Sequence, residues 1–199
     1  MKKPLIAIIG RPNVGKSTFF NRVLNQRYAI VDPEEGITRD RIYGDMEWCG
    51  HLLKFIDTGG YTSDENNHFN SAIRKQSEDA VNEADLILFM VDGKQGLMIN
   101  DIDLAQLVRE SNKPHIIVVN KCDEYKTDDL INQFYELGFD KLFPISALNG
   151  RLTGDLLDAI LETLDIMNLK KIDSQQNYIR LTIVGMPNVG KSTLTNALL

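Results

Sequence analysis

The sequence predicts an α/β fold in which a doubly wound, mainly parallel sheet carries helices on both faces. Short apolar runs alternate along the chain with amphipathic segments of helix length. Two of the runs, at 86–92 and 115–119, are almost continuously apolar, as is usual for strands that are buried on both faces. Polar and glycine-rich stretches follow several of the runs, and open parallel sheets bind their ligands at this edge.

The elements are expected in a regular order along the chain. A tight turn at Cys49–Gly50 predicts an antiparallel hairpin at one edge of the sheet. Asn100 or Asp101 is the expected N-cap of the helix that starts near 99. The expected strands are 4–10, 41–48, 51–57, 84–92, 114–121 and 141–146, and the expected helices are 16–26, 99–111, 127–138 and 152–164.

The pattern predicts three parts of the chain. Residues 1–164 form a first complete domain, and the polar stretch 165–178 is a linker. Residues 179–199 start a second domain with one strand and one helix. Because so short a piece buries little apolar surface, we expect it to be loosely ordered at this length.

The composition narrows the class of protein. Of 199 residues 43% are hydrophobic, yet no apolar run is long enough to span a membrane or to form a signal peptide. We therefore expect a cytoplasmic protein that does not contact membranes, with Cys49 and Cys122 as thiols outside disulfides. The net charge of −6 argues against a broad nucleic-acid-binding face, although Arg39 and Arg41 could form a local basic patch.

A phosphate-binding loop follows the first expected strand. The stretch "GRPNVGKS" fits the pattern G-x-x-x-x-G-K-[ST] between a strand and a helix. Backbone N–H groups of such a loop surround phosphate oxygens, the lysine reaches the β- and γ-phosphates, and the serine hydroxyl binds Mg²⁺. The predicted residues of this loop are Gly10, Arg11, Pro12, Asn13, Val14, Gly15, Lys16, Ser17 and Thr18.

A second motif predicts which base is bound. The stretch "NKCD" follows the strand at 115–119, and the carboxylate of Asp123 can accept hydrogen bonds from N1–H and the 2-amino group of guanine. Adenine has neither donor, so an ATP-using enzyme would require this motif to be accidental. The predicted base-binding residues are Asn120, Lys121, Cys122 and Asp123, with Ser146 and Ala147 from the loop after the last strand.

Two further elements are expected to respond to the γ-phosphate. Asp57 ends a strand in "DTGG" and can hold Mg²⁺ through a water molecule, while the N–H of Gly60 can bond the γ-phosphate. The hydroxyl of Thr38 could complete the Mg²⁺ shell together with Ser17. The motif and its neighbours at this position are Asp57, Thr58, Gly59, Gly60 and Tyr61.

Across 4–164 these motifs resemble the five G motifs of a translation-factor-class GTPase, which is a P-loop NTPase with a Ras-like G domain. The wording "RPNVGKST", "GITRDR" and "DTGGY" is similar to that of the Era, MnmE and Der group. A second loop has 11 identities with the first in 19 aligned positions, which resembles the tandem GTPases of the Der (EngA) family. Its incomplete site comprises Gly185, Met186, Pro187, Asn188, Val189, Gly190, Lys191 and Ser192, and we do not expect it to bind GTP at this length.

The resemblance implies a GTPase that cycles between GTP and GDP as a molecular switch in assembly of the large (50S) ribosomal subunit. It also implies slow hydrolysis stimulated by K⁺, with Asn13 holding the K⁺ ion. Lys16, Thr38 and Gly60 are then the other residues nearest to the reaction.

Tyr61 stands where many Ras-type GTPases have a glutamine that orients the attacking water. Which residue orients that water here stays open. Arg39 or Arg41 acting as an arginine finger is a less favoured alternative to the K⁺ ion. An alternative function is therefore a nucleotide-gated binding module with negligible hydrolysis.

Overall fold

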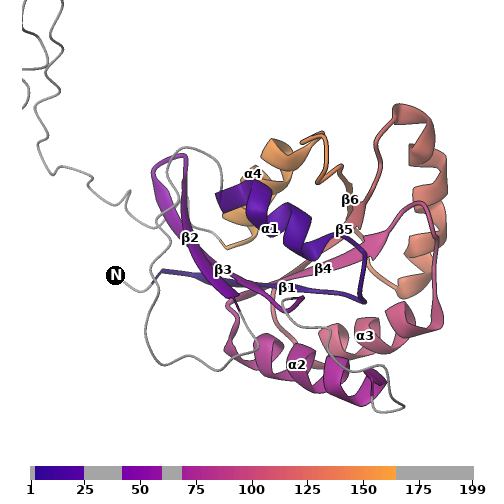
Figure 1. Ribbon diagram of the computed structural model, residues 1–199, viewed down its shortest axis with the longest axis horizontal. Coiled ribbons are helices and arrows are strands. Elements are labelled where there is room, and N and C mark those ends of the chain that lie inside the picture. The colour runs from indigo at the N-terminus through magenta and orange to yellow at the C-terminus, as the bar shows by residue number, and fades with distance from the viewer. Residues whose placement is uncertain (1–2, 25–41, 60–68, 165–199) are drawn as a thin grey trace, which may run out of the picture.

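The structure is a computed structural model that describes residues 3–24, 42–59 and 69–164 (Figure 1). Within these ranges the strands form a single sheet in the order β2-β3-β1-β4-β5-β6. The β2–β3 pair is antiparallel and every other neighbouring pair is parallel, as the sequence predicted. The strands are β1 Leu5–Ile9, β2 Ile42–Trp48, β3 His51–Asp57, β4 Leu86–Asp92, β5 His115–Asn120 and β6 Leu142–Pro144.

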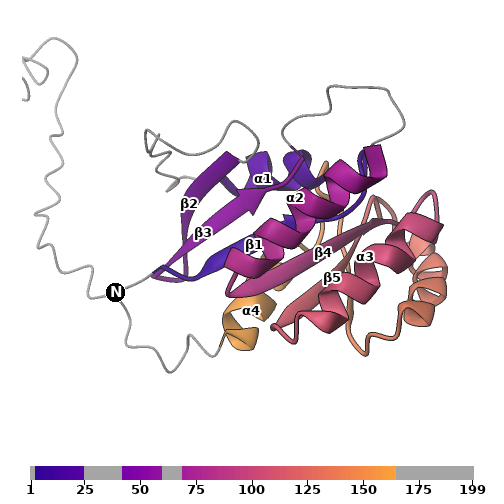
Figure 2. The same ribbon diagram turned by 90° about the horizontal axis from the view of Figure 1, so that it is seen from below.

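Helices cover both faces of the sheet. Figure 1 shows α1 and α4 on one face and α2 and α3 on the other, and Figure 2 shows α2 and α3 covering the sheet and running roughly along its strands. The helices are α1 Lys16–Leu24, α2 Phe69–Glu83, α3 Ile99–Glu110, the 3₁₀ helix η1 Tyr125–Leu137 and α4 Thr153–Thr163. The doubly wound architecture is therefore confirmed.

The core has two halves, one on each face of the sheet. In β1, Ile6 and Ile8 pack on the side of α1 and α4, whereas Ala7 and Ile9 pack on the side of α2 and α3. This alternation follows from the two-residue period of a strand. It explains why β4 is apolar at almost every position: both of its faces are covered.

The edge hairpin turns where the sequence predicted. Cys49 and Gly50 have φ values of 49° and 81°, so both central residues of the turn adopt a left-handed conformation. Such turns match the twist of the two flanking strands. Trp48 at the end of β2 donates a hydrogen bond from Nε1 to Asp158 of α4 at 2.8 Å, which ties the hairpin to the domain.

The predicted cap of α3 was wrong. Met98 is the N-cap, and Asp101 is the third residue of the helix rather than its cap. The Asp101 carboxylate accepts a hydrogen bond from the Met98 N–H at 3.1 Å, so the residue stabilises the helix start from inside the first turn. The same carboxylate is also paired with Arg11.

Helix α2 was not predicted, and η1 differs in type from an α-helix. The described end of α2 buries mainly small residues, Ala80 and Val81, with Ala84 just beyond it, which gives a weak apolar signal in the sequence. Helix η1 spans Tyr125–Leu137 and so starts two residues before the expected position, while Gly138, the expected end, is its C-cap with a φ of 76°.

Several predicted features lie outside the described residues. They are Thr38, Arg39, Arg41, Gly60 and Tyr61, together with the linker 165–178 and the second loop within 179–199. In the part of the chain that the structure describes, no helix combines the length and the apolar character that a membrane span requires.

Candidate functional site

The carboxyl ends of four strands meet at one edge of the sheet. The register pairs Ile8 of β1 with Asp57 of β3, and Asp92 of β4 with Asn120 of β5. The predicted polar residues therefore follow neighbouring strands and face the same edge. The sheet order alone brings the motifs of β1, β3 and β5 together, although they are far apart in the sequence.

The loop after β1 needs glycine at two positions because of close neighbours. An added Cβ on Gly10 would lie 2.3 Å from the backbone oxygen of Met90, and one on Gly15 would lie 2.2 Å from the Asn120 side chain. Both glycines have positive φ, 151° and 101°, as does Asn13 with 64°. These conformations wrap the loop around the start of α1, where the helix dipole favours an anion.

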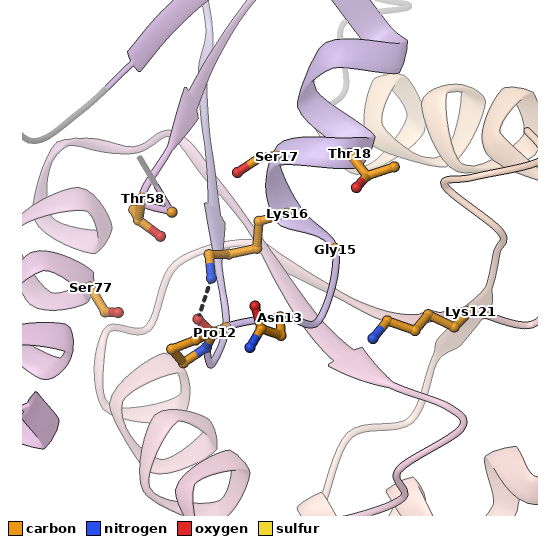
Figure 3. A pocket seen from close by; sticks show the side chains of 11 residues that line it. Pro12, Asn13, Gly15, Lys16, Ser17, Thr18, Thr58, Ser77 and Lys121 are labelled. Atoms are coloured by element: carbon orange, nitrogen blue, oxygen red, sulfur yellow. Dashed lines mark hydrogen bonds between the residues drawn. The ribbon is translucent and has the colours of Figure 1, made fainter. Parts of the chain in front are cut away.

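Lys16 is buried against this loop. Its ammonium donates to the backbone oxygens of Gly10 at 2.9 Å and Arg11 at 3.0 Å, and Figure 3 shows the side chain turned back toward the loop backbone. Burial lowers the pKa of Lys16 from 10.5 to about 8, and the charge of Asp57 opposes this only in part. The hydrogen-bond partners of this ammonium are neutral carbonyls, and a phosphate would supply an anionic one.

Arg11 anchors the loop to α3. Its Nε lies 3.1 Å and 3.2 Å from the two carboxylate oxygens of Asp101, and its Nη1 donates to Gln95 Oε1 at 2.5 Å. Arg11 is only 9% exposed and Asp101 is fully buried. Burial raises the pKa of Asp101, and the Arg11 guanidinium counters that effect. This buried pair fixes the outer side of the loop.

Asn120 ties three loops together. Its Nδ2 donates to the Val14 backbone oxygen at 2.7 Å, and its Oδ1 accepts from the Ala147 N–H at 2.8 Å. The phosphate-binding loop, the loop after β5 and the loop after β6 thus share one buried side chain. Arg22 of α1 supports the same loop by donating to the backbone oxygens of Ala147 and Leu148.

Two lysines and two aspartates form the other end of the site. Lys121 pairs with Asp92 at 2.6 Å, and Lys94 pairs with Asp123 at 2.5 Å. Burial opposes ionisation of Asp92, but hydrogen bonds from Lys121 and from two backbone N–H groups keep the pKa of Asp92 below its usual value. Hydrogen bonds from Lys94 and Ser146 likewise lower the pKa of Asp123. Both carboxylates are therefore ionised at neutral pH.

A pocket of about 410 Å³ extends along the phosphate-binding loop as far as Lys121, and its volume is within the usual range for small-molecule sites. In Figure 3, Ser77 of α2 and Lys121 lie at opposite sides of the phosphate-binding loop. The residues that line the pocket are Gly10, Pro12, Asn13, Gly15, Lys16, Ser17, Thr18, Thr58, Gly59, Ser77 and Lys121.

The oxygen atoms beside Gly59 suit a magnesium ion. An ideal Cβ on Gly59 would lie 3.0 Å from Asp57 Oδ1 and 3.1 Å from Ser17 Oγ, so the two side chains converge at this glycine. A hydroxyl and a carboxylate are oxygen ligands of the kind that Mg²⁺ prefers. The Asp57 carboxylate is also oriented by the Gly59 N–H at 2.8 Å. The two residues thus fit the metal role that the sequence predicted for them.

The structure brings most of the predicted site residues together. The phosphate-binding residues 10–18, the described part of "DTGG", and residues 120–123, 146 and 147 all lie at the same edge of the sheet. Three residues of the site, Ser77, Lys94 and Asp92, were not predicted. Asp92 ends β4 and Lys94 follows it in the polar stretch "DGKQG", and this position at the end of a buried strand was a usable signal. Ser77 carried no such signal, since it lies within the helix that was not predicted.

The fold and this pocket define a P-loop nucleotide-binding domain of the G-domain type. Residues 5–121 and 180–199 match the family described as "50S ribosome-binding GTPase". The chain belongs to this family.

Relatives and solved structures agree with this assignment. The chain is 45% identical over its whole length to GTPase Der of Moorella thermoacetica, and 47% identical over 98% of its length to GTPase Der of Halothermothrix orenii. It spans about 45% of the length of these relatives. The solved structure of an Aquifex aeolicus Era variant bound to GDP.AlF4- has a TM-score of 0.65 and 32% identity, with 82% of this chain and 57% of the Era chain covered.

Proposed function

We propose that the chain binds GTP and GDP and hydrolyses GTP to GDP and phosphate as a molecular switch. The observation that carries the proposal is the double hydrogen bond of Asn120, which joins the phosphate-binding loop to both base-binding loops. A nucleotide that bridges these loops would contact its phosphates and its base through one connected network. Family membership supports the same activity.

In this proposal Lys16 leaves the loop carbonyls and pairs with the β- and γ-phosphates, and the loop N–H groups donate to phosphate oxygens. Ser17 and Asp57 would hold Mg²⁺, and the bound ion would offset negative charge on the phosphates. Thr38 and Gly60, outside the described residues, keep their predicted roles at the γ-phosphate.

Guanine specificity rests on Asp123. Its Oδ1 accepts a hydrogen bond from Ser146 Oγ at 2.7 Å, which fixes the plane of the carboxylate for the N1–H and 2-amino groups of guanine. Ala147 is the next residue of the same loop after β6. Lys121 lines the pocket, where the aliphatic part of its side chain can lie along the purine ring.

The Asp123→Asn variant tests the base assignment. An amide can donate to the 2-oxo group of xanthine, so we expect GDP to bind at least about tenfold more weakly and xanthosine diphosphate to bind better than GDP. Calorimetric titration with both nucleotides measures this. Unchanged preference for GDP would show that Asp123 does not bind the base. The matched control is Asp103→Asn, because Asp103 is an exposed residue of α3.

A second test concerns the proposed K⁺ ion. Asn13 is exposed, lines the pocket and has a left-handed backbone conformation. We expect faster GTP hydrolysis in K⁺ than in Na⁺ buffer, and we expect Asn13→Ala to remove the difference. Equal rates in the two buffers for the unmutated chain would refute a K⁺ role.

For the whole protein, of which the relatives suggest this chain is a part, we propose a cytoplasmic role on the large ribosomal subunit. The family description supports this partner. The net charge of −6 adds no support for RNA contact by this chain itself. Cosedimentation of the chain with purified 50S subunits in the presence of a non-hydrolysable GTP analogue tests whether this part suffices.

A further inference from the structure

Lys94 contacts the base-reading carboxylate, although no motif includes it. Its Nζ lies 2.5 Å from Asp123 Oδ2, while Asp123 Oδ1 accepts the hydroxyl of Ser146 at 2.7 Å. Each oxygen of the carboxylate therefore accepts a hydrogen bond from the protein itself. Guanine would bring two more donors to the same two oxygens.

The backbone holds Lys94 at this place. The N–H groups of Lys94 and Gln95 donate to the buried Asp92 Oδ1 at 2.9 Å and 3.1 Å, so the loop after β4 has a fixed start. The Gly93 N–H donates to the Asn120 backbone oxygen at 2.8 Å, which joins this loop to the loop after β5. The backbone of Lys94 is thus fixed within side-chain reach of Asp123.

We propose that Lys94 competes with guanine for Asp123 and so sets the affinity of the site for guanine nucleotides. This inference rests on the proposed function. The Lys94 ammonium and the edge of guanine both donate hydrogen bonds. If one oxygen of Asp123 accepted from both, the two donor groups would be crowded together at that oxygen. When guanine enters, the ammonium withdraws from Oδ2.

The surroundings of Lys94 allow that withdrawal. Its side chain is 55% exposed even in the ion pair, against 24% for Asp123. The charges of Asp92 and Glu124 also act on the ammonium, so it remains near carboxylates after leaving Asp123. Within the ion pair, Lys94 offsets the charge of Asp123.

The Lys94→Met variant tests the competition by calorimetric titration of the chain with GDP and Mg²⁺. Exposed ion pairs are weak, so we expect GDP to bind about two- to fivefold more tightly in the variant. Lys141→Met is the matched control, because Lys141 precedes β6 at the opposite edge of the sheet and its ammonium lies over the Phe143 ring. We expect no change in GDP affinity for that variant.

Inosine diphosphate makes the test specific for Asp123. Inosine diphosphate keeps N1–H but lacks the 2-amino group, so its base donates only one hydrogen bond to Asp123. Its affinity should therefore rise less in Lys94→Met than the affinity for GDP does. Equal or weaker GDP binding in Lys94→Met, or an equal gain for both nucleotides, would overturn the inference while leaving GTP binding intact. If the unmutated chain bound no GDP, the proposed function itself would fail, and this inference with it.

Discussion

Lys16 is the residue of the site whose chemistry depends most on burial. With carbonyl oxygens as its hydrogen-bond partners and a pKa of about 8, its ammonium is disfavoured in the absence of a phosphate. Below about pH 8 this charge destabilises the folded domain, and the destabilisation fades as the pH rises from about 8 toward 10.5. Phosphates have the opposite effect, because they favour the charged form.

Nucleotide binding should therefore take up a proton above about pH 8. We expect GDP affinity to fall between pH 7.5 and 9 by at most about tenfold per pH unit, since binding must then protonate Lys16. Calorimetry in buffers of different ionisation enthalpy measures the proton uptake. Lys16→Arg keeps its charge over this range, so its affinity should show a smaller slope and no uptake from this position. Equal slopes for the two proteins would show that Lys16 is already fully charged.

The element that fixes the phosphate-binding loop is the start of α3. Asp101 supports its own helix through the Met98 N–H and also pairs with Arg11. Removing one member of a buried pair leaves the other charge without its partner, which is more costly than losing the attraction alone. The position of the outer side of the phosphate-binding loop should therefore depend on Asp101 of α3, which lies 90 residues from Arg11 in the sequence.

Asp101→Ala should lower the free energy of unfolding by about 3–5 kcal/mol. Urea unfolding followed through the emission of Trp48, the single tryptophan, measures this change. Asp103→Ala on the exposed side of the same helix should stay within about 0.5 kcal/mol of the unmutated chain. Similar losses in both variants would refute the anchoring role, and Arg11→Met combined with Asp101→Leu should recover part of the stability.

Across the whole molecule, the sequence predicted best those elements whose local apolar pattern matches their burial in the fold. Strands β4 and β5 are apolar runs in the sequence because both faces of the sheet are covered at these strands. The binding motifs follow strands because the carboxyl ends of parallel strands lie at the same edge of the sheet. The hairpin was predictable from a two-residue turn containing Gly50. These features depend on neighbours in the sequence.

The features that sequence reasoning missed depend on contacts over long distances. Asp101 looked like a helix cap, but its partner Arg11 lies in another motif. Lys94 lies in a polar stretch after a strand, but its pairing with Asp123 depends on the β4–β5 register, which the sequence does not show. Helix α2 buries small side chains and is polar overall, so its sequence offers few large apolar residues. No local pattern shows such pairings.

The central claim is that this chain hydrolyses GTP, and single-turnover hydrolysis tests it most directly. Protein in excess over radiolabelled GTP, with Mg²⁺ and K⁺, should convert the nucleotide to GDP well above the uncatalysed background. Lys16→Ala should lose most of that rate, because the ammonium that pairs with the β- and γ-phosphates is gone. If the unmutated chain binds GTP tightly but produces GDP no faster than the background, the domain is a nucleotide-gated binding module and the claim of hydrolysis is wrong.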